Sequence, residues 1–162
     1  MTEPARFNSD SQMPALERLN AFVGKWKSNG QQYDGPIGPA AKITAVETYE
    51  WLQGEHFMIH RFTGTVGSEE AACIEIMGHD TVTGCYPIHT YYNVGHKADW
   101  RGRVNNGIWT ITGGWQIGGK SRPVRCTIRF SESGNNMAGK WEHSPDGAKW
   151  QTFWEVSATR SK

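Results

Sequence analysis

The stretch Phe22-Val23-Gly24-Lys25-Trp26 separates two kinds of sequence pattern in this chain. Before it, residues 14–22 place Leu16 and Leu19 at helical spacing. After it, short runs alternate with turn signals, which is typical of an antiparallel barrel or sandwich. We therefore expect a short helix that covers one barrel end and a first strand that begins beside Gly24.

Ten strands are predicted in the chain that follows. Runs of about ten residues are separated by turn signals rich in Gly, Pro and Asn. The predicted strands are residues 25–31, 41–52, 55–66, 71–79, 85–93, 96–104, 108–117, 124–131, 137–143 and 149–159. About eight strands already leave room for one small ligand, so ten predict a wider interior that needs bulky side chains or a guest. The predicted fold is all-β, a ten-stranded antiparallel up-and-down barrel with a short N-terminal helix.

Length and hydropathy predict one domain without a membrane span. The 162 residues lie in the usual single-domain range. Residues 1–12 are polar and lack periodicity, so we predict a flexible tail before a barrel domain at 13–162. The mean hydropathy is −0.62, and no apolar run is long enough to cross a membrane. No apolar segment follows the first residues as in a secretion signal, which favours the cytoplasm.

Charge and cysteine content narrow the function classes. The net charge is +1 with scattered Lys and Arg, which offers no electrostatic surface to nucleic acid or acidic lipid. The cysteines Cys73, Cys85 and Cys126 show no CxxC spacing, so we expect no disulfide framework. We predict no cofactor and a monomer or homodimer.

Two turns fix strand registers on apolar faces. Asn106-Gly107 suits a type I′ turn, which favours positive φ at both central residues. It pairs Asn105 with Ile108, Val104 with Trp109, Gly102 with Ile111, Trp100 with Gly113 and Ala98 with Trp115. Residues 144–147, Ser-Pro-Asp-Gly, have the composition of a type I turn. This turn predicts Trp141 opposite Trp150, Met137 opposite Trp154 and, on the outer face, Glu142 opposite Lys149.

A third hairpin predicts a polar pair inside the barrel. A two-residue Gln53-Gly54 loop would place Trp51 opposite His56, Tyr49 opposite Met58, Glu47 opposite His60 and Ala45 opposite Phe62. Opposed Cβ atoms lie ~4.5–5.5 Å apart, so the Glu47 carboxylate and the His60 imidazole would meet. Three interpretations stay open: a satisfied buried pair, a ligand anchor and an acid–base catalyst. No serine or cysteine is recognisably placed as a nucleophile.

Two motif matches are rejected on their context. Residues 114–121 fit the phosphate-loop pattern GxxxxGK[ST], but residues 122–130 alternate like a strand, whereas that motif needs a following helix. A Gly-rich hairpin connection is predicted instead. His56 and His60 have HxxxH spacing, yet four strand residues span ~13 Å, too far for one metal ion. No metal site is predicted.

The eight tryptophans must fill a core or line a cavity. Trp26, Trp109, Trp115, Trp141 and Trp154 share the predicted inner faces. A packed core would place them similarly, but a wide barrel is hard to fill, which favours a pocket for a flat apolar molecule. The predicted ligand-binding residues are Glu47, Tyr49, Trp51, Met58, His60, Trp109, Trp115, Trp141 and Trp154.

The opening stretch resembles the start of the calycin barrels, which comprise lipocalins, fatty-acid-binding proteins and their bacterial relatives. In those folds a glycine turns the chain into the barrel and a tryptophan closes one end, and Gly24 and Trp26 match these positions. A late arginine packs on this tryptophan in lipocalins, and the resemblance assigns that part to Arg160.

Nearly the whole chain is similar to a bacterial family of calycin-like domains of unknown function. The similar segments are residues 35–39, 47–54, Thr83-Gly84 before Tyr86, 141–150 and Arg160. The family implies the fold and assigns no catalytic residues. Haem-binding barrels also begin with Gly-x-Trp, but their C-terminal His-Leu segment is not found here. A haem alternative would use His143 or His60 as the axial ligand.

These observations predict a lipocalin-like barrel that binds a small apolar or aromatic molecule in its interior. One alternative is a small-molecule enzyme that moves protons with Glu47 and His60. The others are the haem-binding barrel and a structural domain with a filled core.

Overall fold

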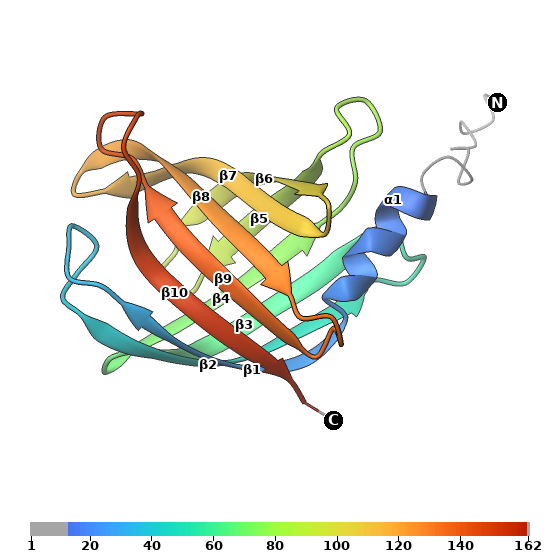
Figure 1. Cartoon of the computed structure of the whole chain (residues 1–162), viewed down its shortest axis with the longest axis horizontal. Coiled ribbons are helices and arrows are strands. Elements are labelled where there is room, and N and C mark those ends of the chain that lie inside the picture. The colour runs from blue at the N-terminus through green and yellow to red at the C-terminus, as the bar shows by residue number, and fades with distance from the viewer. Residues whose placement is uncertain (1–12, 162) are drawn as a thin grey trace.

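Ten antiparallel strands close into one barrel in the computed structural model, which describes residues 13–161. Each strand pairs with its neighbours in sequence, and β1 pairs with β10 to complete the ring (Figure 1). The strands are β1 (Gly24–Gln32), β2 (Ala41–Trp51), β3 (Met58–Val66), β4 (Glu69–Met77), β5 (Tyr86–Tyr92), β6 (Lys97–Asn105), β7 (Ile108–Ile117), β8 (Lys120–Phe130), β9 (Asn136–His143) and β10 (Gln151–Arg160). The predicted ten-stranded up-and-down barrel is confirmed. The predicted tail at 1–12 lies outside the described residues.

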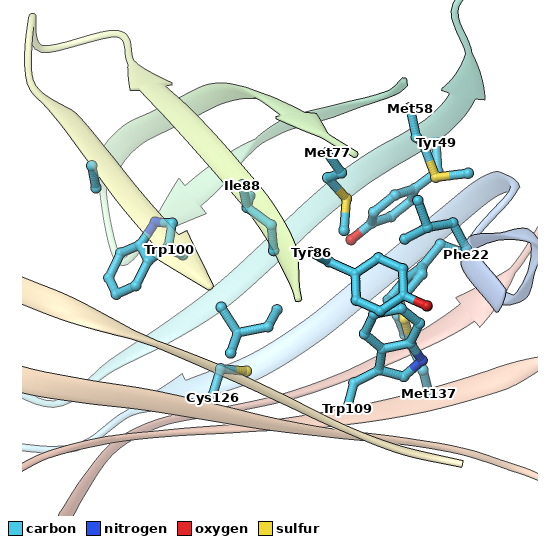
Figure 2. Close-up of a cluster of buried hydrophobic side chains, with 14 of the residues drawn as sticks. Phe22, Tyr49, Met58, Met77, Tyr86, Ile88, Trp100, Trp109, Cys126 and Met137 are labelled. Atoms are coloured by element: carbon cyan, nitrogen blue, oxygen red, sulfur yellow. The ribbon is translucent and has the colours of Figure 1, made fainter. Parts of the chain in front are cut away.

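A short helical segment covers one end of the barrel, as Figure 1 shows. It consists of α1 (Met13–Glu17) and a 3-10 turn, η2 (Arg18–Ala21). Leu19 is fully buried, and Phe22 packs against Trp109 with ring centroids 5.1 Å apart. Trp109 in turn meets Tyr86 at 4.7 Å, and Figure 2 shows these rings gathered in one cluster. Buried aromatic area of this kind is a dominant source of core stability, so this end is closed by packing.

Arg160 ties the last strand to the helical segment. Its guanidinium lies over the Trp26 ring, 4.2 Å from the ring centroid. It also donates hydrogen bonds to the carbonyls of Val23, Ala21 and Gly134, the latter two at 3.0 Å. Gly24 has φ +127°, and a Cβ there would approach the guanidinium to 3.0 Å. A glycine at the start of β1 therefore leaves room for the arginine.

The β6–β7 and β2–β3 hairpins keep their side chains on the predicted inner and outer faces. The pairing register of the β2–β3 hairpin nevertheless differs from the prediction. Asn106-Gly107 gives the predicted pairs from Asn105–Ile108 to Trp100–Gly113. In the β2–β3 hairpin, however, the loop spans 52–57, because Gly54 and Glu55 both adopt positive φ and the Leu52 amide donates to the Phe57 carbonyl. Tyr49 consequently pairs with His60 and Glu47 with Phe62, so the predicted Glu47–His60 and Trp51–His56 pairings are wrong by two residues. A shift of two leaves every side chain on its predicted face.

The β9–β10 register also differs from the prediction. Trp141 pairs with Trp154 rather than with Trp150, and a bulge lies between Thr152 and Trp154. The turn extends past Gly147 because the Asp146 carboxylate accepts hydrogen bonds from the amides of residues 148 and 149. Trp150 instead packs under the Arg125 guanidinium, 4.2 Å away.

The phosphate-loop match, the cysteines and the helices were the subject of three further predictions. The phosphate-loop match is a hairpin turn, since Gly118 and Gly119 join β7 directly to β8 with positive φ at both. Cys73, Cys85 and Cys126 are free thiols. In the part of the chain that the structure describes, no helix has the length and apolar content to span a membrane.

We expect Arg160→Ala to lower the free energy of unfolding by roughly 2–4 kcal/mol, because it removes the cation–π contact and leaves backbone carbonyls unpaired. Arg129→Ala, which removes the same charge from an exposed position on β8, should change it by less than about 0.5 kcal/mol. Urea unfolding followed by tryptophan fluorescence measures both. Equal effects would contradict a specific role of Arg160.

Candidate functional site

The barrel encloses a cavity of about 370 Å³. Phe22 and Met77 form its floor beneath the helical segment. At the opposite end the cavity reaches the β3–β4 and β5–β6 hairpins, where Glu70 and Val94 line it and are exposed. The cavity is therefore closed at the end that the helical segment covers, and it is accessible at the other end.

A chain of hydrogen-bonded side chains crosses the inner face of six neighbouring strands. We name it the polar belt, and its members are Ser28 on β1, Glu47 and Tyr49 on β2, His60 on β3, Glu75 on β4, Thr90 on β5 and Trp100 on β6. The strands β7–β10 supply an apolar wall on the other side, lined by Ile111, Cys126, Ile128, Gly139, Trp141 and Trp154. The cavity lining is thus mostly apolar, and its inner charged groups, Glu47, His60 and Glu75, are gathered on β2, β3 and β4.

His60 lies at the centre of the polar belt. Its Nε2 is 2.9 Å from Glu47 Oε2, and its Nδ1 is 2.7 Å from Glu75 Oε2. Glu75 is directly opposite His60 in the β3–β4 ladder, whereas Glu47 reaches it diagonally from β2. Tyr49, also directly opposite, stacks on the imidazole with ring centroids 3.9 Å apart and planes within 3°. These contacts fix both the position and the tilt of the imidazole.

The two carboxylates are held from their far sides as well. Ser28 Oγ donates to Glu47 Oε1, and the Tyr49 hydroxyl donates to Glu47 Oε2 at 3.3 Å. Thr90 Oγ1 donates to Glu75 Oε1 at 2.8 Å and accepts from Trp100 Nε1 at 3.1 Å.

The Trp100 indole lies over Gly113 of β7. A Cβ at that glycine would come within 2.5 Å of the indole ring. Because Gly113 has no side chain, the Trp100 indole has room to lie at the end of the polar belt.

The polar belt holds a protonated imidazole. Burial alone would lower the pKa of His60, but hydrogen bonds and charges from Glu47 and Glu75 outweigh it and raise this pKa to about 9. Burial would raise the pKa of Glu47, and the hydrogen bond to His60 reverses this to a net lowering. The pKa of Tyr49 is raised by burial and by the Glu47 charge, so its hydroxyl keeps its proton. At neutral pH an imidazolium therefore lies between carboxylates.

The structure brings six of the predicted ligand-binding residues to the cavity. They are Glu47, Tyr49, His60, Trp115, Trp141 and Trp154. Met58 and Trp109 are buried in the closed end, and Trp51 donates from its indole to Asn20 at 2.8 Å, so these three do not line the cavity. The closing group of Gly24, Trp26 and Arg160 lies at the plugged end.

Sequence reasoning missed four members of the polar belt, namely Ser28, Glu75, Thr90 and Trp100. The hydropathy pattern of β4 indicates the wrong inner face, because the exposed residues Ile74 and Ile76 point outward while Glu75 points inward. A usable signal existed in the β3–β4 turn. A two-residue Gly67-Ser68 loop pairs Val66 with Glu69 and so places Glu75 opposite His60.

The haem and metal alternatives find little support in this geometry. Both ring nitrogens of His60 already contact carboxylates, so neither is free to ligate iron. His143 is buried with an unpartnered Nδ1, but it does not line the cavity. Among residues 13–161, no group of three or more His, Cys, Asp or Glu side chains is arranged to hold a metal ion.

Comparison with known proteins agrees with the calycin-like fold. A family model described as "Protein of unknown function (DUF1579)" matches residues 13–160. No curated protein matches the sequence. The crystal structure of Rv2717c from Mycobacterium tuberculosis is similar with a TM-score of 0.65 at 11% identity, covering 92% of this chain and 98% of that chain. The S-type phycobiliprotein lyase CPES from Guillardia theta has a TM-score of 0.57 at 10% identity, covering 98% and 99%. These likenesses show a shared fold.

We expect the free energy of unfolding to fall as pH rises from 6.5 through 9. The pKa of His60 is raised in the folded protein, so its stabilisation is complete below the ordinary value of 6.5 and is lost as the imidazolium loses its proton. The slope reaches at most about 1.4 kcal/mol per pH unit for one proton. Urea unfolding at several pH values measures it, and between pH 6.5 and 8 the slope should vanish in His60→Gln. A flat wild-type profile would contradict the charged network.

Proposed function

The chain belongs to this DUF1579 family, and we propose that its barrel binds a small, largely apolar or aromatic molecule in the interior cavity. The observation that carries the proposal is a cavity of about 370 Å³ with one polar belt and one aromatic wall. Small-molecule sites are typically concave, of ~300–1,000 Å³, and mostly apolar with a few convergent polar groups. The cavity of this barrel has each of these properties.

The size of the cavity argues against a filled core as the purpose of the interior. A dry void costs roughly 24 cal/mol per Å³, so 370 Å³ would cost about 9 kcal/mol. That is comparable to the entire stability of a typical domain, ~5–15 kcal/mol. The interior is therefore occupied by water or by a guest. Water beside Trp141 and Trp154 makes few hydrogen bonds, so an apolar guest that displaces it gains free energy.

Small residues keep this space open. Gly139 and Ala158 line the cavity among larger aromatic neighbours. A Cβ on Gly139 would meet only ordinary contacts, the nearest being Cys126 Sγ at 3.8 Å. A methyl group would fit there without strain, so packing does not require glycine at this position. The absent side chain favours room for a ligand.

Binding accounts for the polar belt better than proton transfer by the Glu47–His60 pair does. A general base needs a free lone pair within reach of the substrate, and both nitrogens of His60 already face carboxylates. Burial raises the pKa of the Cys73 thiol well above its ordinary value, so this cavity-lining cysteine is a poor nucleophile. Rigid, satisfied polar groups beside an apolar wall instead suit the orientation of a bound molecule.

We expect N-phenyl-1-naphthylamine, a neutral apolar fluorophore, to quench tryptophan fluorescence and to bind in the cavity. Gly139→Leu should weaken its binding at least tenfold, because the new side chain projects into the cavity. Gly114→Leu is the matched control, since Gly114 is an exposed strand glycine on β7 and its substitution leaves the interior unchanged. Fluorescence titration of the three proteins gives the dissociation constants.

Equal affinity of Gly139→Leu and wild type would place the probe outside the barrel. Absence of quenching in the wild type would contradict the proposed function. Circular dichroism of each variant confirms that the barrel is folded.

A further inference from the structure

The polar belt offers hydrogen-bond acceptors to the cavity and has few donors left. The hydroxyls of Ser28, Tyr49 and Thr90 and the indole N–H of Trp100 all donate within the belt. Both ring nitrogens of the His60 imidazolium donate to carboxylates. A ligand that needs to receive a hydrogen bond from these groups would have to break an existing bond.

Glu75 has the largest unused acceptor capacity. A carboxylate has about four lone-pair sites. Glu47 uses three of them, for Ser28, Tyr49 and His60. Glu75 uses two, for His60 and Thr90, and its side chain is twice as exposed as that of Glu47, at 18% against 9%. A donor group inside the cavity would therefore meet Glu75 first.

The charged residues that line the cavity also favour a ligand that is cationic or donates hydrogen bonds. Glu47, Glu75 and, at the mouth, Glu70 line the cavity, and no lysine or arginine does so among the described residues. The polar belt contains two carboxyl groups, those of Glu47 and Glu75, and one basic group, the His60 imidazole, so acidic groups outnumber basic ones. A buried uncompensated charge is unfavourable unless a partner neutralises it. The remaining polar side chains of the lining, Tyr92 and Asn93, are uncharged.

Aromatic side chains from β5 and β6 line the cavity on the same side as Glu75. Trp100 and Tyr92 line the cavity, Trp100 is linked to Glu75 through Thr90, and Tyr92 lies two residues from Thr90 on the same face of β5. Aromatic faces attract cations by ~0.5–2 kcal/mol. A carboxylate combined with such rings is suited to an organic ammonium and unfavourable to an anion.

We propose that the cavity selects apolar molecules that carry a cationic or hydrogen-bond-donating head group, which docks on Glu75, and that it rejects apolar carboxylates. This inference rests on the proposed binding function and specifies its ligand class. The apolar part of such a molecule lies against Trp141 and Trp154, and the head group faces the polar belt.

A matched set of three naphthalenes tests the proposal at pH 7.5. 1-Naphthylmethylamine, 1-naphthalenemethanol and 1-naphthoate share one ring system and differ in head-group charge. Displacement of N-phenyl-1-naphthylamine from the full-length protein gives their relative affinities. We expect the amine to bind at least tenfold more tightly than the carboxylate, with the alcohol between them.

Glu75→Gln should reduce the ratio of amine to carboxylate affinity by at least tenfold, because it removes the docking charge. Glu50→Gln is the matched control, since it removes the same charge from the exposed outer face of β2 and should leave the ratio unchanged. The wild-type ratio remains decisive if Glu75→Gln does not fold.

The outcomes separate the two proposals. Carboxylate binding that equals or exceeds amine binding overturns the charge selectivity while the binding function stands. A ratio that changes equally in Glu75→Gln and Glu50→Gln also overturns it, because the selectivity would then reflect overall charge. If neither the fluorophore nor any naphthalene binds, the proposed function fails and the ligand class fails with it.

Discussion

The interior of this barrel depends on one imidazolium held between two carboxylates. A charged side chain in an apolar interior costs several kcal/mol unless opposite charges and hydrogen bonds compensate it. Here Glu47 and Glu75 approach His60 from adjacent strands at 2.9 and 2.7 Å. Their own far oxygens are held by Ser28 and Thr90. The requirement to satisfy one buried charge therefore links the inner faces of neighbouring strands and concentrates polar groups on one side of the cavity.

This concentration leaves the opposite side free to be apolar. The strands β7–β10 face the cavity with aliphatic, aromatic and small side chains, and Gly139 leaves a space that a larger residue would fill. The helical segment closes one end through Phe22, Trp109 and Tyr86, while Arg160 fastens this end to the last strand. Closure is thus achieved by packing at one end, and recognition groups are placed away from it. A molecule with an apolar body and a polar head matches this division.

The sequence predicts the architecture well because barrel strands alternate with turns of recognisable chemistry. All ten strands and the apolar register from Asn105 to Trp100 follow from runs of residues and from one Asn-Gly turn. Glu47 and His60 meet although their predicted register was wrong, since an error of two residues keeps the same face. The β9–β10 register could not be found from turn composition, because the Asp146 side chain extends the loop.

Glu75 was missed for a different reason. Its strand reverses the usual pattern, with isoleucines outside and a carboxylate inside, so hydropathy gives the opposite face. A buried glutamate is favourable there only because it pairs with His60. That pairing depends on how β3 and β4 align, so the pattern of β4 alone does not indicate it. The closed end of the barrel shows a second limit of sequence reasoning. Met58 and Trp109 face inward as predicted, but they pack beneath the helical segment and do not line the cavity. The alternation of inward and outward residues does not determine how deep along the barrel a side chain lies.

A crystal structure of the protein grown with N-phenyl-1-naphthylamine would show whether the barrel interior binds an apolar molecule. We expect probe density inside the barrel, with the rings against Trp141 and Trp154 and the amine hydrogen directed toward Glu75. An interior filled by collapsed side chains, with no probe between β4 and β9, would contradict this expectation.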